Sequence, residues 1–208
     1  MHTLSASQAT AQLQEDRTPY IRLVFTGGYD FSFNGSDDRV VSIEHNEQAY
    51  SGDATIILQN EDGEVPDLRG CAVDIGWGDV TTSGNEYVDS PTMWVVSQTE
   101  TTSPGVLSSK LVLWDIWNII AAIPIDHVGD APDFYFQWEG DTTPFDIMYG
   151  LFAAVSVPLS DYSDDDGITD TMTPWFDVNA PAYETYQGAL RRIIQVTKKY
   201  IRIVTVGI

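Results

Sequence analysis

The chain has 208 residues, of which 43% are hydrophobic, enough for one ordinary domain or two small ones with a buried core. Its 31 acidic residues outnumber 10 basic ones and give a formal net charge of −21. This charge repels phosphate, so it argues against sequence-specific binding of nucleic acid and against an anionic membrane as partner. It is typical of an acidic soluble surface or of a protein from a high-salt environment.

The single cysteine, Cys71, excludes a disulfide within the chain. It lies in the apolar stretch "RGCAVDIGWG", where a buried thiol is expected. The first twenty residues lack the apolar run of an export signal, and the longest apolar stretches are too short to span a bilayer. We therefore expect a protein made in a cytoplasm, without a membrane partner.

The first half of the sequence predicts antiparallel β structure. Residues 1–19 show no strong pattern and are expected to form an N-terminal arm. Residues 28–35 are expected to form a hairpin, and residues 79–91 a long hairpin tip. Short strands separated by Gly, Pro and Asp turns favour an antiparallel β-barrel or sandwich over residues 20–123. These strands are expected at residues 20–26, 39–48, 53–60, 70–78, 92–101 and 105–115.

The pattern changes in the second half, where helices are expected. Residues 115–123 place four isoleucines on one helical face before Pro124. Thr143 and Pro144 are suited to the cap and first position of a helix over residues 142–155.

The last expected helix starts near Pro181 and carries Lys198 and Lys199 in its final turn, where cations favour the negative helix end. Strands are expected at residues 133–140 and 200–206. The fold class is therefore α+β, with a smaller α+β domain over residues 124–208. We expect this domain to be incomplete at its C-terminus, because the final strand has no following partner.

Catalytic and metal motifs find little support in the sequence. The three histidines, His2, His45 and His127, lack the spacing of metal ligands, and we expect His45 in the core or at an interface. No G-x-S-x-G, Walker or G-x-G-x-x-G pattern is present, so we expect no enzyme and no cofactor. Asp and aromatic residues in "YDFSFNGSDD" leave open a sugar-binding or glycoside-hydrolysing surface protein as the alternative.

The acidic stretch "DYSDDDGITD" is the strongest local signal for a metal. With Gly167 at position 6 of a calcium loop, Asp164 and Asp166 take positions 3 and 5. Tyr162 and Thr173 would then stand where the two key ligands belong. A solvated acidic loop is favoured, and Asp164 and Asp166 stay weak calcium candidates.

Aromatic and basic residues supply candidates for a subunit interface. Tryptophan concentrates at interfaces, although core packing is its commoner use. Half of the basic residues fall between Arg191 and Arg202, where they could dock on an acidic neighbour or simply favour a helix end. The interface candidates are Trp77, Trp94, Arg191, Arg192, Lys198 and Lys199.

The order of several short motifs resembles the opening domain of tail hub or baseplate proteins of tailed phages. Residues 54–63, "ATIILQNEDG", are similar to a strand-and-turn core of that family, and residues 68–78 to the strand that follows. "MWVVSQTET" continues the likeness, and "ALRRIIQVTKKYIRI" resembles a helix-then-strand element of the family's second domain. The likeness is good over residues 20–120 and loose over 175–206, and the chain is shorter than a typical hub.

The resemblance implies a structural virion protein. Its work would be to join the tail tube to the tip, as a homo-oligomer with a trimer favoured. The implied partners are tail-tube, distal tail or fibre proteins, and the implied location is the virion tail, with synthesis in the host cytoplasm. A strand, an acidic turn and another strand would then build a ring wall that needs no catalytic side chain.

Overall fold

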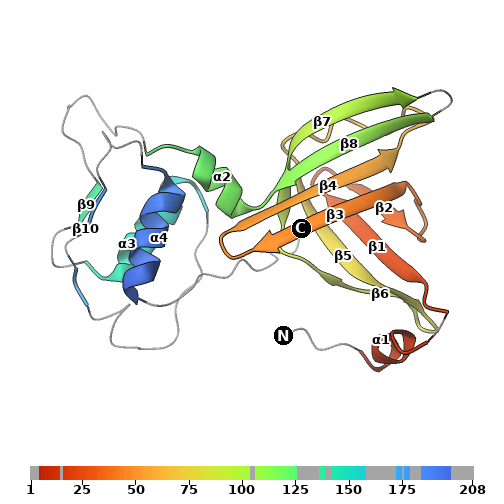
Figure 1. Cartoon of the computed structure of the whole chain (residues 1–208), viewed down its shortest axis with the longest axis horizontal. Coiled ribbons are helices and arrows are strands. Elements are labelled where there is room, and N and C mark those ends of the chain that lie inside the picture. The colour runs from red at the N-terminus through yellow and green to blue at the C-terminus, as the bar shows by residue number, and fades with distance from the viewer. Residues whose placement is uncertain are drawn as a thin grey trace. The chain divides into compact units, whose positions relative to one another are not determined.

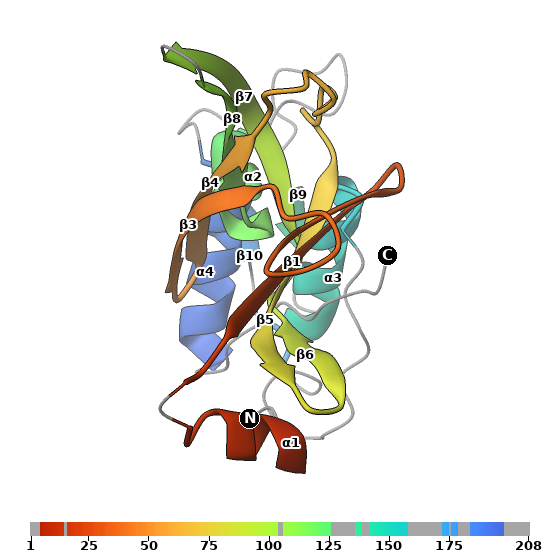
Figure 2. The ribbon, with the colours of Figure 1, turned by 90° about the vertical axis from the view of Figure 1, so that its right-hand side faces the viewer.

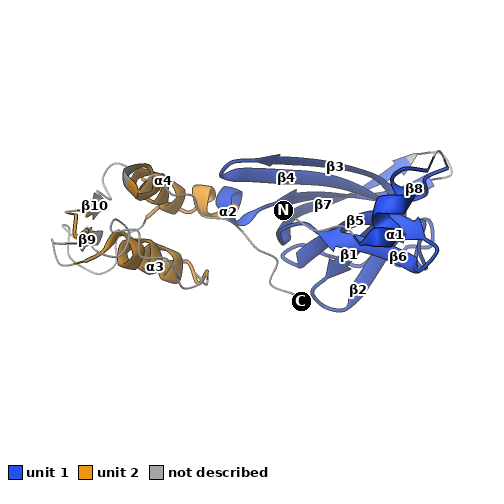
Figure 3. Cartoon of the chain, turned by 90° about the horizontal axis from the view of Figure 1, so that it is seen from below, with its two compact units in different colours: residues 1–118, 203–208 blue, residues 119–202 orange. Residues whose placement is uncertain are grey.

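The computed structural model describes residues 5–14, 16–103, 106–125, 136–138, 142–157, 172–174, 176–178 and 184–197. These fall into two compact units divided between Asn118 and Ile119, shown in different colours in Figure 3. We describe each unit by itself. The domain limits expected from the sequence, 20–123 and 124–208, stay a prediction.

The first unit is built on an eight-stranded sheet (Figure 1). The path of hydrogen-bonded strands runs β2-β1-β5-β7-β8-β4-β3, and β6 pairs with β5 off this path. The described pairings between these strands are antiparallel, as the short turns of the sequence predict. The strands are β1 Pro19–Phe25, β2 Tyr29–Phe33, β3 Val40–Gln48, β4 Ser51–Gln59, β5 Ala72–Thr81, β6 Gly84–Asp89, β7 Met93–Ser103 and β8 Val106–Trp114.

The α+β class is confirmed, and the sheet is curled without being closed into a complete barrel. Strands β2 and β3 are the two ends of the hydrogen-bonded path. Strand β2 and the segment just before β3 approach each other at one isolated bridge, between Ser32 and Asp38. Figure 3 shows β3 and β4 lying opposite β1 and β5 across the interior of this curl.

The core of the first unit lies on the inner face of the curl. Side chains along a strand alternate between the two faces, so the apolar residues at every second position gather inside. Each such side chain contributes roughly 1.5–3 kcal/mol through burial. The largest fully buried members are Phe25, Leu23, Ile56, Leu58, Leu68, Ile75, Met93, Leu111 and Leu113.

Two segments of the first unit differ from the sequence expectation. Part of the expected hairpin tip at 79–91 is strand β6, which pairs with β5 from Gly76 to Thr81. Gly76 and Gly78 leave room for this pairing, since a Cβ on either would meet atoms of β6 within 3 Å. The N-terminal arm contains the helix α1 Ala6–Ala11, capped by Ser5 and lying beside β5 (Figure 2).

Helix α2, Ile116–Ala122, begins on the first unit at a tightly bonded junction. Asp115 Oδ1 accepts the N–H of Asn118 at 2.8 Å, and Asn118 Nδ2 donates to the Gly52 carbonyl at 2.8 Å. Burial raises the pKa of Asp115, against the effect of these backbone hydrogen bonds. Gly52 is required here, because its Cβ would lie 2.9 Å from Asp115 Oδ2.

The second unit contains the helices expected from the sequence. Helix α3, Pro144–Ala154, starts as predicted with Thr143 as its cap, whose Oγ1 accepts the N–H of Asp146 at 3.2 Å. Helix α4, Tyr186–Thr197, packs against α3, and its Leu190 and Ile193 are buried. The short strands β9 Phe136–Trp138 and β10 Phe176–Val178 pair antiparallel. The strand expected at 200–206 lies outside the described residues.

No helix within the described ranges is long and apolar enough to cross a membrane.

Candidate functional site

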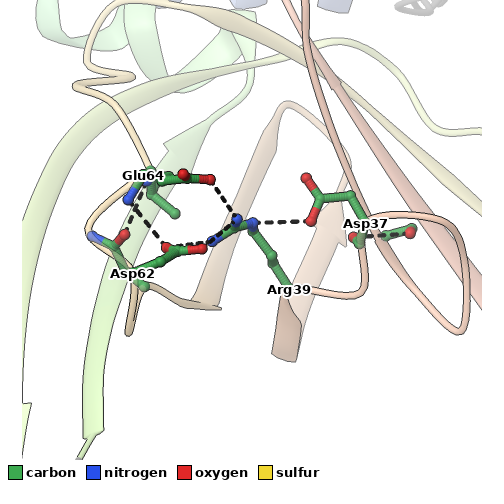
Figure 4. Close-up of polar contacts among 7 residues, drawn as sticks. Asp37, Arg39, Asp62 and Glu64 are labelled. Carbon is green, nitrogen blue, oxygen red and sulfur yellow. Dashed lines mark hydrogen bonds and ion pairs between the residues drawn. The ribbon is translucent and has the colours of Figure 1, made fainter.

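The acidic turn after β4 is organised by one arginine, Arg39, at the start of β3 (Figure 4). Its Nε donates to Asp37 at 2.9 Å, and Nη1 and Nη2 donate to the two oxygens of Asp62 at 2.8 and 2.7 Å. Nη2 also reaches Glu64 at 3.3 Å. The hydrogen bond from Arg39, helped by the N–H of Glu64, lowers the pKa of Asp62 to about 2. The three carboxylates are therefore committed to one cation.

Behind this turn, a buried polar network fixes the loop of residues 60–70. Asn60 is 4% exposed, and its Oδ1 accepts the N–H of Val65 at 2.9 Å. Its Nδ2 donates to Glu100 and to Ser109, both at 3.2 Å. Burial would raise the pKa of Glu100, but hydrogen bonds from Ser109, Gln98 and Asn60 outweigh it, so the pKa is lowered.

The same loop lies along the edge of β7 beyond the short stretch, Met93 and Trp94, that pairs with β5. Gln98 on β7 accepts the N–H of Leu68 at 2.8 Å and donates to the Pro66 carbonyl at 2.9 Å. The N–H of Gly70 donates to the Val95 carbonyl at 2.8 Å. Covered edges cannot pair with other chains, so the loop protects this side of the sheet.

Trp77 lies on the inner face of the curl, which weakens its case as an interface anchor. Its Nε1 donates to Ser90 at 2.9 Å, and its ring stacks on that of His45 with centroids 6.1 Å apart and planes 7° from parallel. Both side chains are half-buried. His45 thus packs across the interior from β3. An interface role for Trp77 stays a prediction.

Trp94 points the other way, to the outer face of the sheet. It pairs with Trp114 across β7 and β8. The next pair along the strands, Val95 and Leu113, is buried, so both tryptophans lie on the opposite, outer face. Trp114 is 36% exposed, and Val96 at the neighbouring bulge is 38% exposed. Trp114 was not among the interface candidates, and the unbroken apolar run "LVLW" at residues 111–114 does not show from sequence alone which face it takes.

The basic cluster near the C-terminus is only partly described. Arg191 is exposed on α4. Arg192 binds Glu184 through two nitrogens, each at 2.8 Å, and its guanidinium lies 4.8 Å from the centre of the Phe176 ring. Arg192 therefore stabilises its own unit. Lys198 and Lys199, like the calcium candidates Asp164 and Asp166, lie outside the described residues.

Within the described ranges, no three His, Cys, Asp or Glu side chains converge on a possible metal position. The buried acids have local roles. Asp74 is 5% exposed and accepts a hydrogen bond from Thr92 at 2.6 Å, while burial raises its pKa. The best-formed polar clusters hold loops and helix ends on the sheet.

Comparison with known proteins shows which solved structures share this fold. No family model matches the sequence, and no curated protein matches it. A tail protein from Neisseria meningitidis MC58 superposes with a TM-score of 0.55 at 16% identity, over 86% of this chain and 45% of that one. The 43 kDa tail protein of prophage MuSo2 from Shewanella oneidensis gives 0.53 at 15% identity, over 86% and 48%.

A third solved structure, the Francisella PdpA–VgrG complex in a half-lidded form, superposes with a TM-score of 0.55 at 10% identity, over 91% of this chain and 30% of that one. The chain thus spans less than half the length of each of these three. The structural neighbours include phage tail proteins, and the fold of this chain is one that such proteins use.

Proposed function

We propose that the protein is a structural component of a phage-like tail, and that it forms part of the hub joining the tail tube to the tip. The observation that supports this most is the shared fold: 86% of the chain superposes on tail proteins from two bacterial sources. The sequence motifs at residues 54–63 and 68–78 point to the same family independently of the superposition.

The polar geometry of the first unit suits this role. Arg39, Asn60 and Gln98 fasten a long loop onto the sheet, and Asp115 fastens the start of α2. A wall that transmits load between neighbours needs fixed loops more than it needs a reactive group. The proposal therefore assigns the protein no catalytic activity.

Assembly would proceed through copies of this chain and through other tail proteins, in a virion built in the host cytoplasm. Strands β2 and β3 end the described sheet path, and such edges are usually covered in a finished structure. The outer pair Trp94 and Trp114 supplies the aromatic contact area that interfaces favour. We expect a closed homo-oligomer, with a trimer favoured.

Electron microscopy of tailed particles tests this proposal. Particles from a culture that carries the gene are labelled with gold-conjugated antibody against the chain, and their proteins are identified by mass spectrometry. We expect gold at the tip end of the tail and a fixed stoichiometry to the tube protein. Particles that lack the chain, or labelling along the capsid alone, would overturn the proposal.

A further inference from the structure

A partly open cavity of about 340 Å³ is lined by residues at the start of β1 and by their neighbours on the paired strand β5. Its volume is near the lower end of the roughly 300–1,000 Å³ of small-ligand pockets, so it suits a single residue better than an extended peptide. Of the side chains that line it, that of Arg17 carries a charge, and the others are apolar, aromatic or absent. The lining residues are Arg17, Pro19, Tyr20, Ile21, Trp77 and Gly78.

One nitrogen of Arg17, Nε, is paired with a buried acid, Asp79, whose second oxygen Oδ2 makes no hydrogen bond within the described residues. This Nε lies 2.5 Å from Oδ1 of Asp79, whose side chain is 1% exposed, while the Arg17 side chain is 49% exposed. The neighbouring backbone is fixed too, because the N–H of Val80 donates to the Thr18 carbonyl at 2.9 Å. A buried partner that orients an exposed charged group is the usual support of a binding residue.

The terminal nitrogens of Arg17 are unused within the described part of the chain: neither Nη1 nor Nη2 makes a hydrogen bond there. By contrast, Arg22, Arg39 and Arg69 each bind a carboxylate through a terminal nitrogen. A guanidinium is a planar fork of donors that matches the two oxygens of a carboxylate. An arginine with its fork free, at an otherwise uncharged cavity, is therefore suited to an anion with an apolar stem.

We propose that this cavity binds a carboxylate on an apolar stem, and that its occupant is the C-terminal residue of a partner polypeptide. A C-terminal residue presents its carboxylate directly beside its side chain, within the space of one residue. An internal Asp or Glu would have to bury flanking peptide groups against the apolar walls, where they lack partners. The net charge of −21 repels anions at long range, so recognition depends on contact with Arg17.

That the partner is a tail protein rests on the proposed function, whereas the chemistry of the cavity does not. The test uses the full chain in solution and the indole N–H signals of its six tryptophans in a proton–nitrogen correlation spectrum. The Trp77 signal is assigned by its loss in Trp77→Phe. N-acetyl-leucine is titrated as a minimal C-terminus, and N-acetyl-leucine amide as the same stem without the charge.

We expect N-acetyl-leucine to shift the Trp77 signal until the site is saturated. The amide should bind at least about tenfold more weakly, because it cannot form the charge-assisted hydrogen bonds with Arg17. Arg17→Lys should weaken the binding of N-acetyl-leucine by a similar factor. Lysine keeps the positive charge opposite Asp79 but lacks the two parallel donors of a guanidinium. Arg69→Lys, at an exposed arginine paired with Asp67, is the matched control and should leave binding unchanged.

The proposed carboxylate site would be overturned by any of three results: equal shifts with the acid and the amide, no shift with either, or unchanged binding in Arg17→Lys. Binding of 4-methylpentanoate as tight as that of N-acetyl-leucine would overturn the polypeptide terminus as occupant, since that acid has no peptide group. These results are distinct from a failure of the proposed function. If the chain is found at tail tips but the titration shows no binding, only this inference fails. If the chain binds N-acetyl-leucine but is absent from tails, only the proposed function fails.

Discussion

Arg39 and Arg17 are both arginines at strand starts, and they are used in opposite ways. Arg39 donates hydrogen bonds from Nε, Nη1 and Nη2 to Asp37, Asp62 and Glu64, and 18% of its side chain is exposed. Arg17 donates from Nε alone, to the buried carboxylate of Asp79. An arginine whose three nitrogens are all hydrogen-bonded fastens a loop, whereas Arg17 keeps Nη1 and Nη2 as donors for the carboxylate ligand proposed above.

The largest expected effect comes from the network that supports the Arg39 turn. Asn60→Ala should lower the free energy of unfolding by about 2 kcal/mol or more, because each buried polar group left without a partner costs roughly 1–3 kcal/mol. The N–H of Val65 and the side chain of Ser109 lose their contacts with it. Urea unfolding measures the change.

Asn46→Ala is the matched control, at an exposed asparagine with one 3.3 Å contact to Asp53. It should change stability by less than about 0.5 kcal/mol. If both variants lose the same amount, the loop is not held by Asn60.

Next in size is the removal of the half-used arginine. Arg17→Gln leaves the carboxylate of Asp79 buried without its cation, and we expect a loss of about 1–2 kcal/mol. This is below the roughly 3–5 kcal/mol of a fully buried pair, because the Arg17 side chain is 49% exposed. Thermal and urea unfolding report it. Arg69→Gln should cause no measurable change, and an Arg17→Gln protein as stable as the unmodified chain, or more stable, would show that the pair does not contribute to stability.

A local effect is expected at the saturated arginine. Arg39→Ala removes the cation shared by three carboxylates, so the turn should loosen through their mutual repulsion. Amide hydrogen exchange of residues 61–64 should accelerate while that of Ile56 and Leu111 in the core strands stays the same. Exchange that rises across the whole sheet, or nowhere, would contradict the view of Arg39 as a local fastener.

The smallest effect is a shift in one titration. Asp62 has a lowered folded-state pKa, so its contribution to stability is present above pH 3.8 and is lost as the pH falls towards about 2. The carboxyl carbon of Asp62, followed by NMR, should titrate near 2 in the native protein. In Arg39→Ala it should move up towards 3.8. An unchanged midpoint in the variant would remove Arg39 as the cause.

Much of the sheet could be predicted from the sequence because alternation and turn residues act locally. The strands at 39–48 and 53–60 were found nearly to the residue, and so was the Thr143–Pro144 helix start. Strand β6 was missed because "GNEYVD" is mostly polar and follows β5 after a short turn, so it was assigned to the hairpin tip.

The candidate site was harder to predict, because its contacts join distant residues. Arg17 and Asp79 are 62 positions apart, and Asn60 and Ser109 are 49 apart. Trp77 was chosen for its type, but only strand register and the curl of the sheet decide that it points inward to His45. Residue type gave candidates, and three-dimensional placement was needed to rank them.

We propose that copies of this chain assemble into a ring in a phage-like tail. Size-exclusion chromatography with light scattering, combined with two-dimensional class averages of the purified chain, tests it most directly. We predict a mass that is a fixed multiple of 23.1 kDa, with three copies favoured, and ring-shaped averages. A single 23.1 kDa species that persists at high protein concentration, with no ring in the averages, would contradict the account.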